Sequence, residues 1–151
     1  MADIVSKAKR SKMMAGIKSA NTKIEILIRK ELFSLGFRYR RNWKKLPGKP
    51  DLFVLRYNKV IMLNGCFWHG HNCHLFKMPS SNSEFWQNKI LTNKSNDFEK
   101  QNKLNELGYP VLTVWECAIR GKGKIDFDTL NNKISEWLKK GTTNFDIGGH
   151  S

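Results

Sequence analysis

A long helical pattern separates two apolar strand segments near the middle of this chain. The segment from about Ser83 to Leu107 is typical of a helix, and it is followed by Gly108, a residue type that often ends helices. One apolar strand segment, 60–63, precedes it, and another, 110–115, follows it. Because strands joined by a helical crossover run parallel, the pattern predicts a parallel pair within a sheet that carries helices on both faces.

The other patterns complete a mixed α/β fold. Segments 52–55 and 60–63 flank Tyr57-Asn58-Lys59 and predict an antiparallel β-hairpin. Three further elements are expected: a helix at 22–35, a strand at 37–42 and a helix at 128–140. For the first helix, Thr22 and Glu25 have the spacing of a capping box, and Gly36 stands where the helix should end.

We divide the chain into three parts on these patterns. Residues 1–20 are basic and weakly amphipathic and are expected to form an arm. Residues 21–140 contain all the predicted strands and main helices and are expected to form one folded domain. Residues 141–151 are expected to form a polar, frayed tail.

The chain carries a large excess of positive charge. Lysine and arginine number 27 and aspartate and glutamate 13 among 151 residues, which gives a formal net charge of +14. Such a field attracts polyanions, and nucleic acid is the first candidate because lysine and arginine neutralise phosphates. An anionic membrane surface is the second candidate. It is disfavoured because the basic residues do not gather on one amphipathic helix and no apolar run is long enough to span a bilayer.

The three cysteines indicate a reducing compartment. They cannot all pair within one chain, and the basic N-terminus has no apolar stretch behind it. We therefore expect a cytoplasmic protein with free thiols rather than a secreted disulfide scaffold.

These thiols suggest a structural zinc site. Two cysteines and a histidine fall within one short loop, and a third cysteine follows the last predicted strand, whose end can meet that loop. Three thiolates and an imidazole can close a tetrahedral Zn²⁺ shell that leaves no open position. The candidate ligands are Cys66, His71, Cys73 and Cys117, with His69 and His74 as competing imidazoles. The alternative is that the cysteines are small buried or unmetallated thiols.

A second candidate site lies at the start of the hairpin. Asp51 follows Pro50 and opens an apolar strand, a place where nucleases hold Mg²⁺ against a phosphate. His69 lies a few residues beyond the paired strand and could activate water near neutral pH. The alternatives are ordinary turn chemistry for Asp51 and a surface or core role for His69. Glu25 is by default a capping residue.

Aromatic pairs stand next to these polar residues. Phe67-Trp68 lies in the loop that contains the two cysteines, and Phe85-Trp86 lies at the start of the long helix. Such pairs usually belong to a core, but in a basic protein exposed rings can wedge between base pairs. The helix then carries Lys89 and Asn93, which can reach base edges or simply form a solvated face.

Several motifs together identify a family. PGKPDLFV, NGCFWHGHNCHLFK, EFWQNKI, LGYPVLTVWECAIRG and the opening RSKMMAGIKS cover the chain from about residue 8 to 140. They resemble the very-short-patch repair (Vsr) DNA mismatch endonucleases. The resemblance implies a restriction-endonuclease-like fold. It also implies that the enzyme nicks double-stranded DNA 5′ to the thymine of a T·G mismatch left by deamination of 5-methylcytosine, and so starts very short patch repair.

The resemblance also implies roles for individual residues. Asp51 would bind Mg²⁺ with the main-chain carbonyl of Leu63, His69 would be the general base, and Glu25 would support it. The structural zinc would be held by Cys66, His71, Cys73 and Cys117. The DNA-contacting residues would be Phe67, Trp68 and Trp86 as an aromatic wedge, Met14 and Ile17 from the arm in the opposite groove, and Lys89 and Asn93 at the T·G pair.

This sequence departs from the family pattern at the end of the second hairpin strand. Leu63 stands where the family often has threonine, which leaves the carbonyl unchanged. Asn64 stands where it often has histidine, and it can hydrogen-bond a phosphate or water but cannot transfer a proton. The Glu/Gln-x-Lys pattern usual for the fold is also missing, so catalysis should depend on the metal and His69.

The sequence is compatible with three functions. The first is the mismatch endonuclease, expected to act as a monomer with links to a cytosine-5 DNA methyltransferase and general mismatch-repair proteins. The second is a zinc-stabilised DNA-binding module without catalysis, against which Asp51 and His69 argue. The third is a restriction-type nuclease that cuts perfect duplexes, against which the aromatic residues argue.

Overall fold

The centre of the molecule is one five-stranded mixed sheet. The computed structural model describes residues 23–149, so Met14, Ile17 and Thr22 lie outside the described residues. The strands are β1 (Arg40–Arg41), β2 (Leu52–Val54), β3 (Lys59–Asn64), β4 (Val111–Trp115) and β5 (Phe145–Ile147), and they lie in this order across the sheet. The first three are antiparallel, whereas β4 is parallel to β3 and β5 is parallel to β4.

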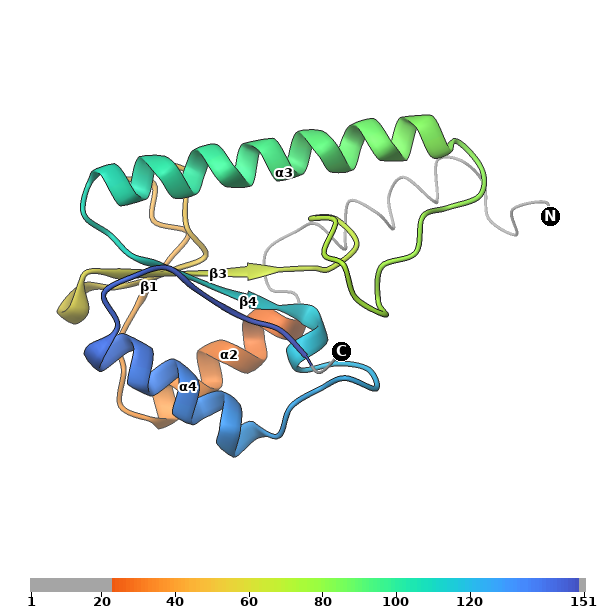
Figure 1. Ribbon diagram of the computed structural model, residues 1–151. Coiled ribbons are helices and arrows are strands. Elements are labelled where there is room, and N and C mark those ends of the chain that lie inside the picture. Colours follow the sequence, from red (N-terminus) through yellow and green to blue (C-terminus); the bar gives the residue numbers. More distant parts are fainter. Residues whose placement is uncertain (1–22, 150–151) are drawn as a thin grey trace.

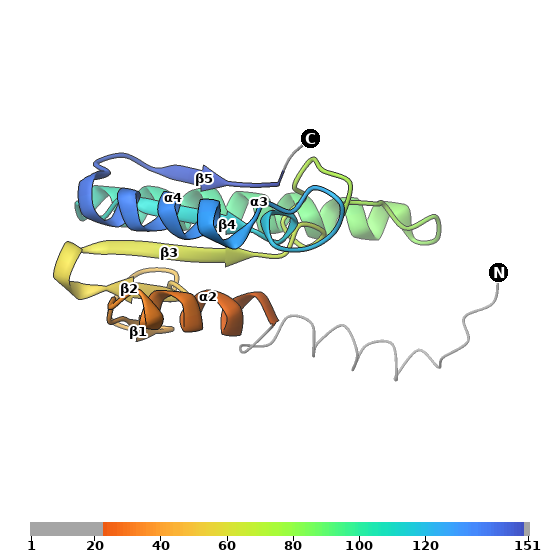
Figure 2. The same cartoon turned by 90° about the horizontal axis from the view of Figure 1, so that it is seen from below.

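Helices cover both faces of this sheet, as the sequence predicts. The helices are α2 (Lys23–Ser34), α3 (Ser83–Glu106) and α4 (Phe127–Lys140). α3 crosses one face, and α2 and α4 lie side by side on the other (Figure 1 and Figure 2). Because α3 joins β3 to the parallel strand β4, the predicted helical crossover is confirmed. None of the helices within residues 23–149 combines the length and apolar character needed to cross a membrane.

Most of the buried apolar surface lies under α2 and α4. Strand residues Leu52, Ile61 and Leu112 alternate along their strands with residues of the other face, and all three are fully buried. They pack against the inner sides of the two helices, which contribute Ile28, Leu32, Leu130, Ile134 and Leu138. A smaller cluster under α3 contains Leu46, Phe53, Val60, Leu104 and Val111.

The N-terminal half of α3 reaches beyond the sheet. Only Ile90 and Leu104 of this helix are buried. In Figure 1 its first turns extend past the end of β3 and lie over the loop that follows that strand. α3 therefore acts as a support for this loop, which contains most of the predicted site residues.

The C-terminal segment differs from the expectation. We expected residues 141–151 to be a frayed polar tail, but Phe145–Ile147 form β5 at the edge of the sheet. Ile147 is buried, and the side chain of Asn144 accepts a hydrogen bond from the Val111 main-chain N–H at 2.9 Å. The strand is short and its stability comes from β4, so its own sequence pattern is too weak to reveal it.

Two other boundaries also change. The strand expected at 37–42 is limited to Arg40–Arg41, and β2 ends at Val54, where a turn of 3₁₀ helix begins. Gly36 has a φ of +92° and follows α2, which confirms the predicted helix end.

The ends of α4 are held by polar side chains. Asp126 accepts a hydrogen bond from the Thr129 main-chain N–H and so caps the start of the helix. At the other end the buried Nζ of Lys59 donates to the main-chain oxygens of Trp137 and Leu138 at 2.8 and 2.7 Å. A cation at this position satisfies terminal carbonyls and fixes α4 against β3.

Candidate active site and metal cluster

Asp51 lies directly before β2 and faces the end of β3. Its Oδ2 accepts a hydrogen bond from the Leu63 main-chain N–H at 2.7 Å. Burial raises the pKa of Asp51 from 3.8 to about 6, and the hydrogen bond from Leu63 only partly opposes this effect. A carboxylate that is costly to ionise in this position is well suited to bind a cation, because a bound cation would offset the cost.

Glu25 supplies a second carboxylate nearby, and this one is buried. Its side chain is 4% exposed, and its Oε1 lies 3.8 Å from Nη2 of Arg41. The negative charge of Glu25 contributes to the raised pKa of Asp51, which shows that the two carboxylates lie in one electrostatic environment. Carboxylate and carbonyl oxygens are the ligands that Mg²⁺ prefers, so the donor set at this edge fits that ion.

His69 forms a close pair with a residue that the sequence analysis did not identify. Its Nδ1 lies 2.5 Å from Oδ2 of Asp97, which is on α3. A carboxylate that holds Nδ1 fixes the ring orientation and leaves Nε2 for proton transfer. The spacing contained a signal, since Asp97 follows Asn93 by one helical turn and so lies on the same side of α3.

The loop that carries His69 is fastened to α3. Gly70 has a φ of +63°, and a Cβ added there would lie 2.5 Å from Cε of Lys94 and 2.6 Å from Cγ2 of Ile90. Only glycine permits this approach of the loop to the helix. Two residues before Gly70, the Trp68 main-chain oxygen accepts a hydrogen bond from Nδ2 of Asn93 at 2.8 Å. Asn93 therefore positions the loop in this structure.

Asn64, the last residue of β3, lies in the same region. It is buried, and it lines a hollow of about 370 Å³ together with His69 and Asp97. The hollow lies between the end of the sheet and α3. Asn64 is thus close to the candidate base, where its amide can hydrogen-bond but cannot exchange a proton.

The four predicted metal ligands come together in one cluster. The ligand atoms of Cys66, His71, Cys73 and Cys117 all lie within 4.8 Å of one another. Nδ1 of His71 is 3.6 Å from the sulfur of Cys66 and 3.5 Å from that of Cys117. Tetrahedral zinc with its usual bond lengths separates nitrogen and sulfur ligands by about 3.6 Å. The cluster can therefore hold a metal ion, with His71 rather than His69 or His74 as the imidazole.

The surroundings of the cluster fit this use. Burial lowers the pKa of His71, which favours the neutral imidazole that binds metals, and the ring stacks on Trp115 at 4.2 Å. Burial raises the pKa of Cys66 and Cys117, so without a cation their thiolates are disfavoured. Main-chain N–H groups point at two of the sulfurs: Cys117 N–H donates to Cys66, and Gly149 N–H donates to Cys117.

The aromatic residues form a cluster of their own. Phe67, Trp68 and Trp86 lie with ring centres 5.3–5.7 Å apart in edge-to-face contacts. All three are half-buried, and none belongs to either hydrophobic core of the described residues. Phe85 packs on Trp86 and is 59% exposed. The core interpretation of these pairs is therefore not supported, and the rings remain accessible at the surface beside the loop. Lys89 is half-buried on α3, one turn before Asn93.

Comparisons with known proteins identify the family of the chain. The family model "DNA mismatch endonuclease Vsr" matches residues 2–75, which include Asp51 and His69. The chain is 44% identical to the DNA mismatch endonuclease Vsr of Escherichia coli K12 over 138 residues, which are 91% of this chain and 88% of that protein. It is 43% identical to the type II nicking enzyme V.NmeAIP of Neisseria meningitidis over 90% of this chain and 96% of that protein. With most of its length covered at such identity, the chain belongs to the Vsr family of DNA mismatch endonucleases.

Proposed function

We propose that this protein nicks double-stranded DNA on the 5′ side of the thymine in a T·G mismatch and so starts very short patch repair. The observation that carries the proposal is the His69–Asp97 pair, at 2.5 Å, in the same electrostatic environment as the half-buried Asp51. A DNA-binding module without catalysis has no need for a histidine oriented by a carboxylate beside a second acid that is costly to ionise.

We propose Asp51 and the main-chain carbonyl of Leu63 as the ligands of a catalytic Mg²⁺. When bound there, Mg²⁺ supplies a Lewis acid that stabilises negative charge on the phosphate and the leaving oxygen. The role of the chain is to hold the donor oxygens in place. The 2.7 Å hydrogen bond from Leu63 N–H orients the Asp51 carboxylate, and Glu25 and Arg41 fix the other side of the site.

His69 is the proposed general base. Its Nε2 takes a proton from a water molecule as the water oxygen attacks phosphorus, and the imidazolium that forms is stabilised by Asp97. The bond from phosphorus to the 3′ oxygen breaks, and that oxygen takes a proton from solvent. The products carry a 5′-phosphate and a 3′-hydroxyl. Asn64 can hydrogen-bond the phosphate or the water but does not move a proton.

We propose that the cysteine cluster holds a structural Zn²⁺. Its four ligands leave no open position for substrate, and Cys117 comes from the end of β4 whereas the other three come from the loop. A metal there would tie the loop with His69 to the sheet. This arrangement gives the zinc a supporting role, distinct from the Mg²⁺ at Asp51.

The aromatic cluster is the proposed mismatch detector. A T·G wobble pair stacks less well than a Watson–Crick pair, so Phe67, Trp68 and Trp86 can enter the step beside it at lower cost. Lys89 and Asn93 would contact the T·G pair, and Asn93 would keep its bond to Trp68 through Nδ2 and offer its Oδ1 to the base. Met14 and Ile17 would enter from the opposite groove. We further propose a cytoplasmic monomer that works alongside a cytosine-5 DNA methyltransferase and general mismatch-repair proteins.

One experiment tests the proposal against its alternatives. The protein is incubated with Mg²⁺ and two labelled duplexes that differ only in a T·G pair, and single-strand nicks are mapped. We expect one nick 5′ to the mismatched thymine, none in the homoduplex and none with Asp51→Ala. Cleavage of both duplexes would favour the restriction-type nuclease, and tight binding without cleavage would favour the binding module.

A further inference from the structure

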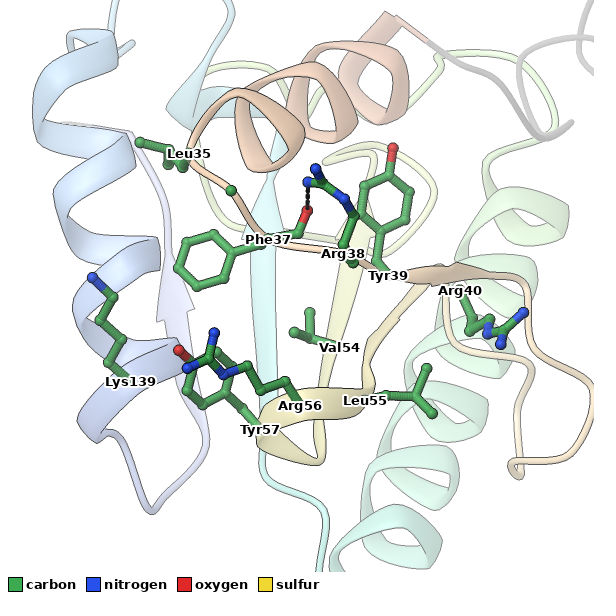
Figure 3. Close-up of a pocket in the computed structure, with 11 residues that line it drawn as sticks. Leu35, Phe37, Arg38, Tyr39, Arg40, Val54, Leu55, Arg56, Tyr57 and Lys139 are labelled. Carbon is green, nitrogen blue, oxygen red and sulfur yellow. Dashed lines mark hydrogen bonds between the residues drawn. The ribbon is translucent and has the colours of Figure 1, made fainter.

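A hollow of about 760 Å³ lies at the end of β2 that is remote from Asp51. It is lined by the segment 35–40 that follows α2, the turn at 54–57 and Lys139 of α4 (Figure 3). Asp51 and Leu55 are four positions apart along the chain, which at about 3.3 Å per residue is roughly 13 Å. DNA bound at the catalytic edge therefore leaves this hollow outside the scissile site.

The charge of this hollow is entirely positive. Its lining contains four cationic side chains and no carboxylate. They are Arg38, Arg40, Arg56 and Lys139, and all four are exposed. Among residues 23–149 none of them forms an ion pair with a carboxylate. Four cations around one concave surface repel one another, so an anionic ligand would relieve an existing cost.

The cations are held by ring faces and main-chain oxygen instead. The Arg38 guanidinium lies 4.1 Å from the centre of the Phe33 ring and donates to the Phe37 main-chain oxygen at 3.2 Å. The Arg56 guanidinium lies 5.5 Å from the centre of the Tyr57 ring. These contacts restrict the side chains but use none of the bidentate capacity that arginine has for carboxylates.

The same hollow also offers apolar contact. Figure 3 shows Phe37, Val54 and Tyr57 along it; Phe37 and Val54 are buried, whereas the ring of Tyr57 is half-buried. Leu35 and Leu55 at its margin are each 44% exposed. A DNA backbone presents phosphates and sugars and has no apolar side chain to place against these residues. A peptide that carries both carboxylates and apolar side chains matches the whole lining.

We propose that this surface, the basic hollow, binds an acidic segment of a partner protein in which carboxylates alternate with apolar side chains. Arginines at the rim pair with the carboxylates, and the apolar side chains cover Leu35, Leu55 and the ring of Tyr57. This inference is independent of the proposed mismatch chemistry, because its ligand approaches an end of the sheet that contains none of the catalytic residues.

The test uses a labelled synthetic peptide that alternates glutamate or aspartate with leucine and phenylalanine. Binding to the full chain is followed by fluorescence anisotropy at about 0.1 M salt, where charges interact over about 10 Å. A control peptide has glutamine and asparagine in place of the acids. The double variant Arg56→Glu, Lys139→Glu changes the hollow, and Lys122→Glu, Lys133→Glu changes the net charge equally at exposed positions elsewhere.

We expect saturable binding of the acidic peptide and weak binding of the control peptide. The Arg56, Lys139 pair should weaken binding about tenfold, since two exposed charge interactions of this kind together correspond to about 1.4 kcal/mol. The Lys122, Lys133 pair should change it less than about twofold. In amide NMR spectra the peptide should shift Gly36, Val54 and Tyr57 but not His69. The melting curve shows whether the Arg56→Glu, Lys139→Glu variant folds. If it does not, Arg56→Gln with Lys139→Gln should still weaken binding about threefold.

Several results would overturn the proposal. They are no saturable binding to the wild-type chain, equal loss in both charge-reversed pairs, or equal binding of the amide control peptide. A selective loss of DNA affinity in the Arg56, Lys139 pair would instead assign the hollow to the DNA surface. Because nicking by these variants is measured separately, failure of the peptide test leaves the endonuclease proposal intact, and the converse also holds.

Discussion

The half-buried carboxylate of Asp51 should reduce the stability of the metal-free protein. The pKa of Asp51 is about 6 in the folded chain, against 3.8 without the fold. At about 1.36 kcal/mol for each pKa unit, ionising Asp51 costs the folded state about 3 kcal/mol. Because folding raises this pKa, the folded state binds the proton more tightly. Wild-type stability should therefore fall as the pH rises from about 4 to about 6 and then level off at this cost.

Asp51→Asn mimics the protonated acid and can still accept the hydrogen bond from Leu63. We expect the variant to be more stable by about 2–3 kcal/mol at pH 8, or roughly 5–10 °C in Tm, and equal to the wild type near pH 4. Urea and thermal unfolding across this pH range, in buffer without added divalent cations, measure the difference. Glu99→Gln, an exposed acid on α3, is the control and should not show the gain.

The same variant should be inactive, and added Mg²⁺ should raise the Tm of the wild type but not that of Asp51→Asn. A stability gain that accompanies lost activity is the mark of a site selected for function rather than stability. The reasoning is refuted if Asp51→Asn is no more stable than the wild type at pH 8, or if its gain is the same at pH 4.

Four other perturbations test the rest of the site. Cys117→Ser should reduce bound zinc below one per chain and lower Tm, as measured by metal analysis and thermal melting. His74→Ala should leave the zinc content and Tm unchanged. Full zinc and an unchanged Tm in Cys117→Ser would contradict the proposed zinc site. Asp97→Asn should slow nicking about a hundredfold with DNA affinity unchanged, and Glu99→Gln should not; a normal rate would remove Asp97 from the mechanism. Trp68→Ala with Trp86→Ala should reduce the ratio of T·G to homoduplex affinity in a folded protein, and an unchanged ratio would return the rings to a packing role. Raising salt from about 50 to 200 mM should weaken DNA binding about a thousandfold, and a flat response would contradict the role of the +14 charge.

The sequence predicted those features whose signals are local or whose residue types are rare. The helix at 83–107 shows its period over many residues, and the crossover then follows from topology. The metal ligands could be selected because the chain has only three cysteines. Their meeting depended on β3 and β4 being neighbours, which the crossover already implied.

What the sequence could not reveal depends on partners far along the chain. β5 pairs with β4 through Leu112 and Phe145, and three residues carry too little alternation to predict a strand. Asp97 has the pattern of a solvated helix face and becomes significant only through His69, 28 residues away. In the sequence Lys59 has the pattern of a turn residue. In the structure its side chain donates to the end of α4, 78 residues later.

The metal cluster also sets an order of events during synthesis. Cys66, His71 and Cys73 leave the ribosome together, and Cys117 follows 44 residues later. At about 5–20 residues per second this interval lasts roughly two to nine seconds, whereas helix formation takes microseconds or less. A nascent chain can therefore hold an incomplete, three-ligand shell while α3 is already formed. The last thiolate arrives only when β4 pairs with β3, so completion of a metal shell and closure of the sheet would be one late step.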